Sequence, residues 1–116
     1  MTRSLPDYLA ALNKGASGLT FADTLAVIDA HYDFTPTGFH NGGVDNPAGS
    51  NNGSCKVFSF ARLQNLTAPQ TLLMFAEHYQ NVLNDPGGDA HANIRAFMKT
   101  GFDGLKFEGA ALSLRA

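Results

Sequence analysis

The chain has 116 residues, 44% of them hydrophobic and 16% charged, with a formal net charge of −2 at pH 7. These values are typical of one soluble globular domain with a single hydrophobic core, and they argue against a chain that is disordered throughout. The balanced charge offers no basic surface for nucleic acid or an anionic membrane, and no apolar run reaches the roughly 20 residues that span a bilayer. The single cysteine, Cys55, cannot form a disulfide within the chain and favours a reducing compartment, so we expect a cytoplasmic protein.

Two helices are predicted in the N-terminal third of the chain, where apolar residues are spaced three and four apart. The first follows Ser4 as its N-cap, and Gly15 ends it. The second follows a capping box formed by Thr20 and Asp23. It ends before Pro36, because the residue that precedes a proline avoids the helical region.

Two further helices are predicted in the C-terminal half. One follows a capping box formed by Thr67 and Gln70 and continues, with apolar residues on one face, to the breaker-rich sequence NDPGG at residues 84–88. The other is expected to take Asp89 as its N-cap and to end at Gly101.

Residues 55–66, CKVFSFARLQNL, are apolar on almost every side of a helical projection, which favours a buried helix; a strand over residues 56–60 is the alternative. Residues 34–39 are expected to be extended and residues 105–109, LKFEG, to form a short strand, and these two segments could pair. The predicted fold class is therefore mainly helical α+β. We expect a single domain over residues 1–116, with about five helices, a small β element and a long ordered loop rich in glycine and asparagine.

This loop precedes the buried helix in the stretch TGFHNGGVDNPAGSNNGSCKVFSF. Five glycines and four asparagines lie between Gly38 and Gly53. Connections of this length without regular structure are uncommon in compact domains, and they are usually functional or disordered; a plain surface connection is the alternative. The loop ends at Ser54, which we interpret as the N-cap of the buried helix. Cys55 and Lys56 would then lie in its first turn.

A helix N-terminus attracts anions, and Lys56 would add a full positive charge to it. The same field stabilises a thiolate, so Cys55 is a candidate nucleophile, although a lone cysteine is more often a small buried hydrophobic residue. The sequence GSNNGSCK does not have the glycine and lysine spacing of a phosphate-binding P-loop. We therefore expect a small anionic ligand rather than a nucleotide held by that motif.

His91 and Arg95 lie four residues apart at the start of the last predicted helix, where a basic pair opposes the helix dipole unless an anion is bound. His91 is therefore the second candidate catalytic residue, and His40 in the loop could reach the same cleft. The histidines lack metal-binding spacing, so neither a metal nor a cofactor is expected. The predicted ligand-binding residues are Asn41, Asn46, Asn51, Ser54, Lys56, Asn93 and Arg95.

The motifs YDFTPTGFHNG, NPAGSNNGSCKVFSFARL, QTLLMFAEHY and HANIRAFMKTGFDGLKFEG occur in this order, and together they resemble the HopJ type III effector family over roughly residues 19–112. The resemblance implies an intracellular protein, in some members one that enters host cells through a type III secretion system. It brings no catalytic residue with it. The chain departs from the family pattern in having Ala90 before His91, where Asp is frequent, and Phe102 in place of Trp.

Two hypotheses about function follow. The first is a small-anion site, with or without enzymatic activity, formed by the loop 41–56 and the helix start 91–95. It requires that these segments meet at one pocket, with Cys55 accessible there and close to Arg95. The second is a non-enzymatic interaction protein, either a secreted effector that acts on a host partner or a cytoplasmic assembly factor. It requires a contiguous exposed apolar patch.

Overall fold

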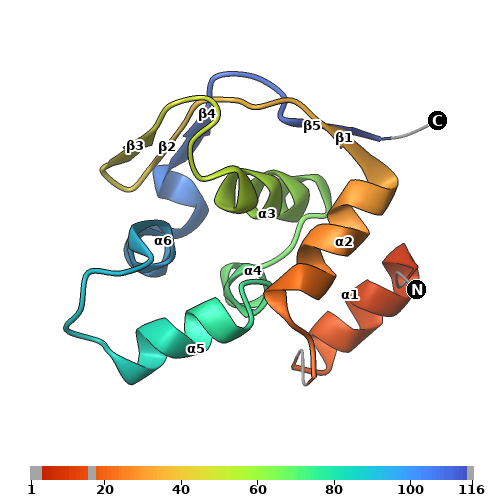
Figure 1. Ribbon diagram of the computed structural model, residues 1–116, viewed down its shortest axis with the longest axis horizontal. Helices are drawn as coiled ribbons and strands as arrows, with labels where there is room; N and C mark the ends of the chain where they lie inside the picture. Colours follow the sequence, from red (N-terminus) through yellow and green to blue (C-terminus); the bar gives the residue numbers. More distant parts are fainter. Residues whose placement is uncertain (1–3, 16–17, 115–116) are drawn as a thin grey trace.

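Six α-helices and five short strands form the part of the chain that the structure describes, residues 4–15 and 18–114, in a computed structural model (Figure 1). The helices are α1 (Leu5–Asn13), α2 (Phe21–His31), α3 (Asn52–Leu63), α4 (Ala68–Leu73), α5 (Glu77–Asn84) and α6 (Ala92–Thr100), followed by a 3-10 turn (Gly101–Gly104). The strands are β1 (Tyr32–Phe34), β2 (Phe39–Asn41), β3 (Val44–Asn46), β4 (Leu105–Phe107) and β5 (Leu112–Leu114). The prediction of a mainly helical α+β domain is confirmed.

Helix α3 lies at the centre of the molecule, with the other helices and the strands around it (Figure 1). Val57, Phe58, Phe60 and Ala61 are each 0% exposed, although they point to different sides of the helix. The middle turns of the helix are buried on nearly every side, with only Lys56 partly exposed there, which explains why apolar residues occur almost all round its sequence. The prediction of a buried helix in this region is confirmed, and the strand alternative is wrong.

The core around α3 is aromatic. The ring of Phe58 lies 5.4 Å from that of Phe75 and 4.9 Å from that of Phe97, so α3 packs against the segments that carry α4 and α6. On the other side, the buried hydroxyl of Tyr8 lies 2.7 Å from Thr24 Oγ1, which donates to the carbonyl of Met74. Burial raises the pKa of Tyr8 to about 12. This chain of hydrogen bonds joins α1, α2 and the end of α4.

The predicted helix from Thr67 to residue 84 is divided into α4 and α5. The break is at Ala76, whose backbone has φ 51° and ψ −118°, and the N–H of His78 donates to the carbonyl of Phe75 across it. This conformation matches the first central position of a type II′ turn, which glycine normally occupies. The sequence carries no glycine or proline there, so the break had no local signal.

The glycine- and asparagine-rich stretch is only partly a loop, because β2 and β3 form a hairpin within it. The two strands pair from Phe39 with Asn46 to Asn41 with Val44, across a two-residue turn. Gly42 and Gly43 form this turn with φ of 55° and 99°, the left-handed conformation that such hairpins require.

The expected pairing between residues 34–39 and 105–109 occurs at one end only. Phe39 pairs with Phe107 in the β3-β2-β4 sheet, as expected, whereas Phe34 belongs to β1 and pairs with Leu112 of β5 in a second, two-stranded sheet. Among the residues that the structure describes, no helix combines the length and the apolar character needed to cross a membrane.

Candidate functional site

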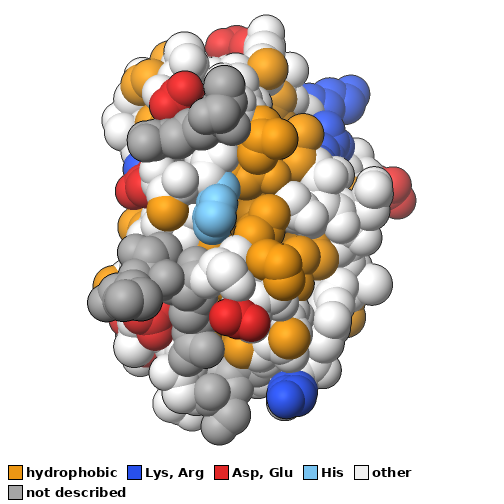
Figure 2. Space-filling model, turned by 90° about the vertical axis from the view of Figure 1, so that its right-hand side faces the viewer, with side chains coloured by type: hydrophobic (Ala, Val, Ile, Leu, Met, Phe, Trp, Pro, Cys, Tyr) orange, Lys and Arg blue, Asp and Glu red, His pale blue; other side chains and the backbone are white. Residues whose placement is uncertain are grey.

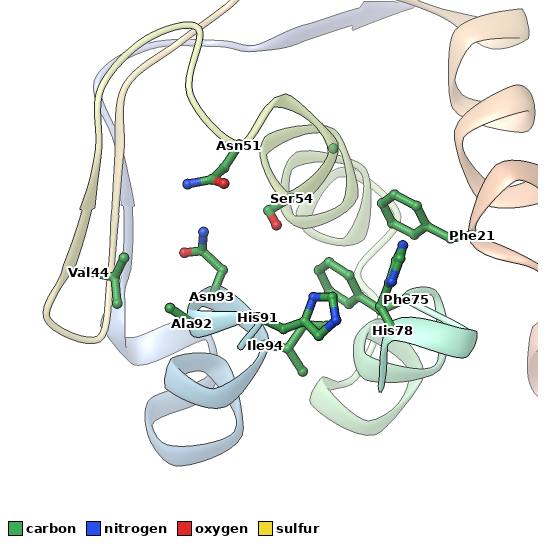
Figure 3. A pocket seen from close by; sticks show the side chains of 11 residues that line it. Phe21, Val44, Asn51, Ser54, Phe75, His78, His91, Ala92, Asn93 and Ile94 are labelled. Carbon is green, nitrogen blue, oxygen red and sulfur yellow. The ribbon is translucent and has the colours of Figure 1, made fainter. Parts of the chain in front are cut away.

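A cavity of ≈ 390 Å³ opens between the hairpin and the first turns of four helices (Figure 3). Its walls come from α2, α3, α5, α6, β3 and the segment that joins α4 to α5. The lining residues are Phe21, Val44, Asn51, Gly53, Ser54, Phe75, His78, His91, Ala92, Asn93 and Ile94.

The lining residues lie mainly at helix starts. Phe21 is the first residue of α2, His78 is the second residue of α5, and Ser54 is in the first turn of α3, as Asn93 is in that of α6. Each helix N-terminus carries a partial positive charge of about half a unit and backbone N–H groups without intrahelical partners. The N-terminal ends of four helices, each with a partial positive charge, therefore lie around the cavity.

Carboxylates of the chain already occupy two of these ends. Asp23 closes the capping box of α2 with Thr20. The carboxylate of Glu77, in the first turn of α5, accepts a 2.7 Å hydrogen bond from the N–H of Phe21. This hydrogen bond is the main reason that the pKa of Glu77 is lowered, and a second bond from its own N–H adds to the effect.

The other two ends, those of α3 and α6, have no such partner. Neither helix has an acidic residue in its first turn or a side-chain cap, whereas each of the other four described α-helices has at least one of the two. Their N-caps, Asn51 and His91, adopt left-handed conformations with φ of 51° and 57°. The first intrahelical bonds are donated by Cys55 to Asn51 and by Arg95 to His91, so the three N–H groups that precede each donor are free of the helix ladder.

A network of asparagine amides fixes these two helix starts relative to the hairpin. Asn93 accepts from the side chains of Asn41 and Asn46 at 3.0 and 3.1 Å and donates to Asn46 at 2.9 Å. Asn51 donates to the same Asn46 oxygen at 2.6 Å. Because Asn41, Asn46 and Asn93 are buried, loss of the network as a whole would leave buried amide groups unpaired.

The opposite wall of the cavity is aromatic. Phe21 stacks on Phe75 with ring centroids 5.8 Å apart, and the ring of His78 meets the edge of Phe21 at 4.8 Å. The ring of His91 lies 4.9 Å from that of His78, so the two imidazoles stand side by side (Figure 3). Nδ1 of His78 is shut off from solvent and has no hydrogen-bond partner within the described part of the chain.

The predicted site residues divide into three groups. Asn51, Ser54, His91 and Asn93 line the cavity, so the loop and the start of α6 do meet there. Asn41 and Asn46 lie behind the lining in the amide network.

Lys56 and Arg95 form the third group and face elsewhere. The ammonium of Lys56 pairs with Asp29 at 2.8 Å. The guanidinium of Arg95 donates to the carbonyls of Ala90 and Pro86 and so closes the turn before α6. Neither cation lines the cavity, so the positive potential there comes from backbone and not from these side chains.

The prediction that Ser54 caps the buried helix is wrong, and it misplaced Cys55. Helix α3 begins at Asn52, so Cys55 lies past the free N–H groups and its own N–H bonds to Asn51. Its side chain is 0% exposed and its thiol donates to the carbonyl of Thr37. Burial raises the pKa of Cys55. A helix start therefore does not activate this thiol, and Cys55 does not line the cavity, so the condition that Cys55 is accessible there is not met.

Two other expectations about this region are also corrected. His40 does not reach the cavity, because it lies in β2 and pairs with the side chain of Asp45 across the hairpin. Helix α6 begins three residues after Asp89, with His91 as its N-cap. Because α6 starts later than predicted, His91 is the N-cap of this helix and lies beside the cavity.

Sequence reasoning missed the aromatic wall formed by Phe21, Phe75 and His78. Phe21 and Phe75 follow ordinary helical spacing, which gives no sign of a site, and only the unmarked turn at Ala76 brings His78 to the cavity. Across residues 4–15 and 18–114, no group of three or more His, Cys, Asp or Glu side chains is placed to hold a metal ion.

The fold and cavity define a class: a small α+β domain in which helix starts surround one partly polar site. The family model described as "HopJ type III effector protein" matches residues 5–112, which is most of the chain. The chain therefore belongs to the HopJ type III effector protein family, as the motifs suggested. It is also similar to a crystal structure described as "unknown function protein VPA0580", with 43% sequence identity and a TM-score of 0.95, covering 99% of this chain and 97% of that one. Comparison with curated proteins gives no match.

Proposed function

We propose that the protein binds a small anion in the cavity, between the N-termini of α3 and α6. One observation carries the proposal: these two helices lack both an acidic residue in the first turn and a side-chain cap, and both open into the same cavity. A helix N-terminus stabilises a nearby anion by roughly 0.3–1 kcal/mol, and by up to about 2 kcal/mol when the site is partly buried. Two such ends acting on one anion approximately double this contribution.

Hydrogen-bond donors for the anion are present on both sides. The hydroxyl of Ser54 and the side-chain amide of Asn51, which has a second N–H besides the one bonded to Asn46, lie at the start of α3, and the first residues of α6, Ala92 and Asn93, lie across the cavity from them (Figure 3). Hydrogen bonds to a charged group contribute about 1.5–3 kcal/mol each, which is more than neutral pairs contribute. The site therefore supplies neutral donors and dipoles, and needs neither Lys56 nor Arg95.

The proposal can be tested with a carboxylate introduced at the start of α3, because it would compete with a bound anion. Asn52 is the exposed first residue of α3 and does not line the cavity. Asn52→Asp places a carboxylate at the free helix end and should raise the free energy of unfolding by about 0.5 kcal/mol. Titration with inorganic phosphate, followed by the amide signals of Gly53, Ser54 and Asn93, should show an affinity several-fold weaker than in the wild type.

The matched control is Asn81→Asp, which adds the same charge to an exposed position within α5. This variant should bind phosphate as the wild type does. If phosphate leaves the three amide signals unchanged in the wild type, or if both variants lose affinity equally, the site is not an anion site.

Any enzymatic use of the site would run through the histidine pair and not through Cys55. The rings of His78 and His91 lie 4.9 Å apart at the cavity, and histidine is the side chain best suited to proton transfer near neutral pH. His91→Gln separates the two roles: it should leave phosphate binding within a few-fold of the wild type and remove any phosphoryl or acyl transfer activity found with the wild type. Activity that persists in this variant would exclude His91 as the catalytic group.

A second candidate, an interaction protein, is favoured by the surface. Figure 2 shows hydrophobic side chains gathered in a band over the side of the molecule that α1 and α2 form. The family description as type III effectors favours a host protein as the partner. A lysate pull-down with the wild type and with Ala26→Glu, which charges an exposed position of α2, tests it. Retention of the same proteins by both would count against this face as the interface.

A further inference from the structure

We propose that the anion bound in the cavity is the head group of an organic phosphate monoester whose flat, apolar part lies against the ring of Phe21. This inference rests on the proposed anion site and adds the chemical class of the ligand. It follows from three properties of the cavity: its volume, the arrangement of its donors and the chemistry of its second wall.

The volume exceeds what a simple anion needs. A cavity of ≈ 390 Å³ has space for roughly a dozen water-sized groups, at about 30 Å³ each. It also falls within the range of about 300–1,000 Å³ that is typical of pockets for small organic ligands. An inorganic anion between the two helix starts would leave most of this space unfilled, so the ligand carries a second group.

The donors favour a phosphate over a carboxylate. The free N–H groups belong to two helices, and their N-caps, Asn51 and His91, are on different segments that the amide network holds in place. A carboxylate has two oxygens in one plane, whereas a phosphate monoester has three acceptor oxygens in a tetrahedral arrangement. A phosphate can therefore accept from both helix starts at once and still be esterified on its fourth oxygen.

The second wall favours a flat, apolar group on that fourth oxygen. Phe21 is only partly buried, and its ring stacks on Phe75 while the ring of His78 meets its edge. Val44 and Ile94 add aliphatic surface on other sides. Aromatic walls contact flat groups over a large area with little loss of side-chain freedom, because the rings are already held by their neighbours.

Gly53 joins the two walls. A Cβ added at Gly53 would lie 3.0 Å from Cζ and 3.3 Å from Cε2 of Phe21, so the edge of the ring sits directly against the α3 backbone. The absence of a side chain at Gly53 lets the ring lie next to the helix start, where the phosphate would bind. Gly53 has no left-handed φ and lies within a helix, so its backbone does not require glycine.

The experiment compares inorganic phosphate, glycerol phosphate, phenyl phosphate and phenol as ligands of the wild type by calorimetry and amide chemical shifts. Phenyl phosphate should bind about tenfold more tightly than either inorganic phosphate or glycerol phosphate, which corresponds to about 1.4 kcal/mol. Phenol should bind more weakly than phenyl phosphate, because it lacks the anion.

Two variants then locate the effect. Gly53→Ala and Phe21→Leu should each reduce the preference for phenyl phosphate over inorganic phosphate, taken as the ratio of the two affinities measured in the same variant, to about twofold or less. Alanine is favoured over glycine in helices, so Gly53→Ala should remain folded. Phe34→Leu, at a partly buried phenylalanine of β1 outside the cavity, is the control for Phe21→Leu and should keep the full preference.

The outcomes separate this inference from the proposed function. Equal binding of inorganic and phenyl phosphate overturns the inference and leaves the anion site standing, as does a preference that both variants retain. Binding of neither phosphate, or binding of phenol as tightly as phenyl phosphate, overturns the anion site and the inference together.

Discussion

Cys55 shows how a shift of three residues in a helix start reverses the chemistry of a side chain. With Ser54 as N-cap, the thiol would lie in the first turn, where free N–H groups stabilise a thiolate. With α3 starting at Asn52, the same thiol is buried among core side chains and donates to the carbonyl of Thr37. Burial then dominates and raises the pKa of Cys55.

We expect Cys55 to be inert in the folded protein. Because its thiol is 0% exposed and its pKa is raised, a thiol reagent should modify it at least about 100-fold more slowly than a free cysteine of pKa near 8.5 at the same pH. In denaturant the rate should rise to that of the free thiol. A folded-state rate that matches the free thiol near neutral pH would contradict this assignment.

At the scale of single residues, sequence reasoning identified residue type better than residue orientation. Asn51, Ser54 and Asn93 were predicted as site residues and do line the cavity. Lys56 and Arg95 were grouped with them because of their charge, yet each has a partner outside the cavity. Spacing along a chain does not specify which neighbour a long side chain will reach, and partners such as Asp29 come from elements distant in sequence.

At the scale of elements, the accuracy of the predicted helix boundaries followed the strength of the capping signals. The capping boxes of Thr20 with Asp23 and of Thr67 with Gln70 are both present as predicted. The unmarked boundaries at Asn51, Ala76 and His91 were missed, and all three are residues with positive φ that are not glycine. The packing of the whole domain imposes these conformations, so local propensity could not indicate them.

The turn at Ala76 stores backbone strain that a substitution should release. A non-glycine residue in such a conformation costs on the order of 1–3 kcal/mol, whereas glycine adopts it without a steric clash. Part of this gain is offset because glycine gives the unfolded chain more conformational freedom. We therefore expect Ala76→Gly to raise the free energy of unfolding by about 0.5–1 kcal/mol in urea denaturation. Ala26→Gly, in the regular part of α2, is the matched control and should lower it.

The sequence did contain a signal for the β2–β3 hairpin. Asn41-Gly-Gly-Val44 has the two-residue turn composition that favours a hairpin, but the surrounding glycines and asparagines led to its interpretation as a loop. Its pairing with β4 was half predicted, through the segments that contain Phe39 and Phe107. Strand register in such short segments depends on contacts with β4, which lies more than 60 residues further along the chain.

At the scale of the whole molecule, the starts of α2, α3, α5 and α6 meet around one cavity, which concentrates positive potential. The chain supplies Asp23 and Glu77 to α2 and α5, and these carboxylates keep that part of the arrangement favourable. The lowered pKa of Glu77 reflects this role, because the hydrogen bond from Phe21 stabilises its charged form.

Stability should therefore depend on pH through Glu77. Since its folded pKa lies below the value in the unfolded chain, its contribution is fully present above the unfolded pKa and is lost as pH falls through the folded pKa. Glu77→Gln should be less stable than the wild type at pH 7, and the difference should shrink below about pH 4. Glu108→Gln, at an exposed position beyond β4, is the control. A difference between Glu77→Gln and the wild type that is independent of pH would contradict an electrostatic origin.

The asparagine network has a consequence for how this region opens. Asn41 and Asn93 are 52 residues apart in the chain, yet the amides of Asn41 and Asn46 both join the hairpin to Asn93 at the start of α6, and β2 is also held by β4. Segments linked in this way unfold together rather than fray one at a time, because releasing either leaves buried polar groups of the other without partners. Backbone amides of the hairpin, of the start of α6 and of β4 should then exchange with deuterium at a common opening free energy, so the cavity wall behaves as one cooperative unit.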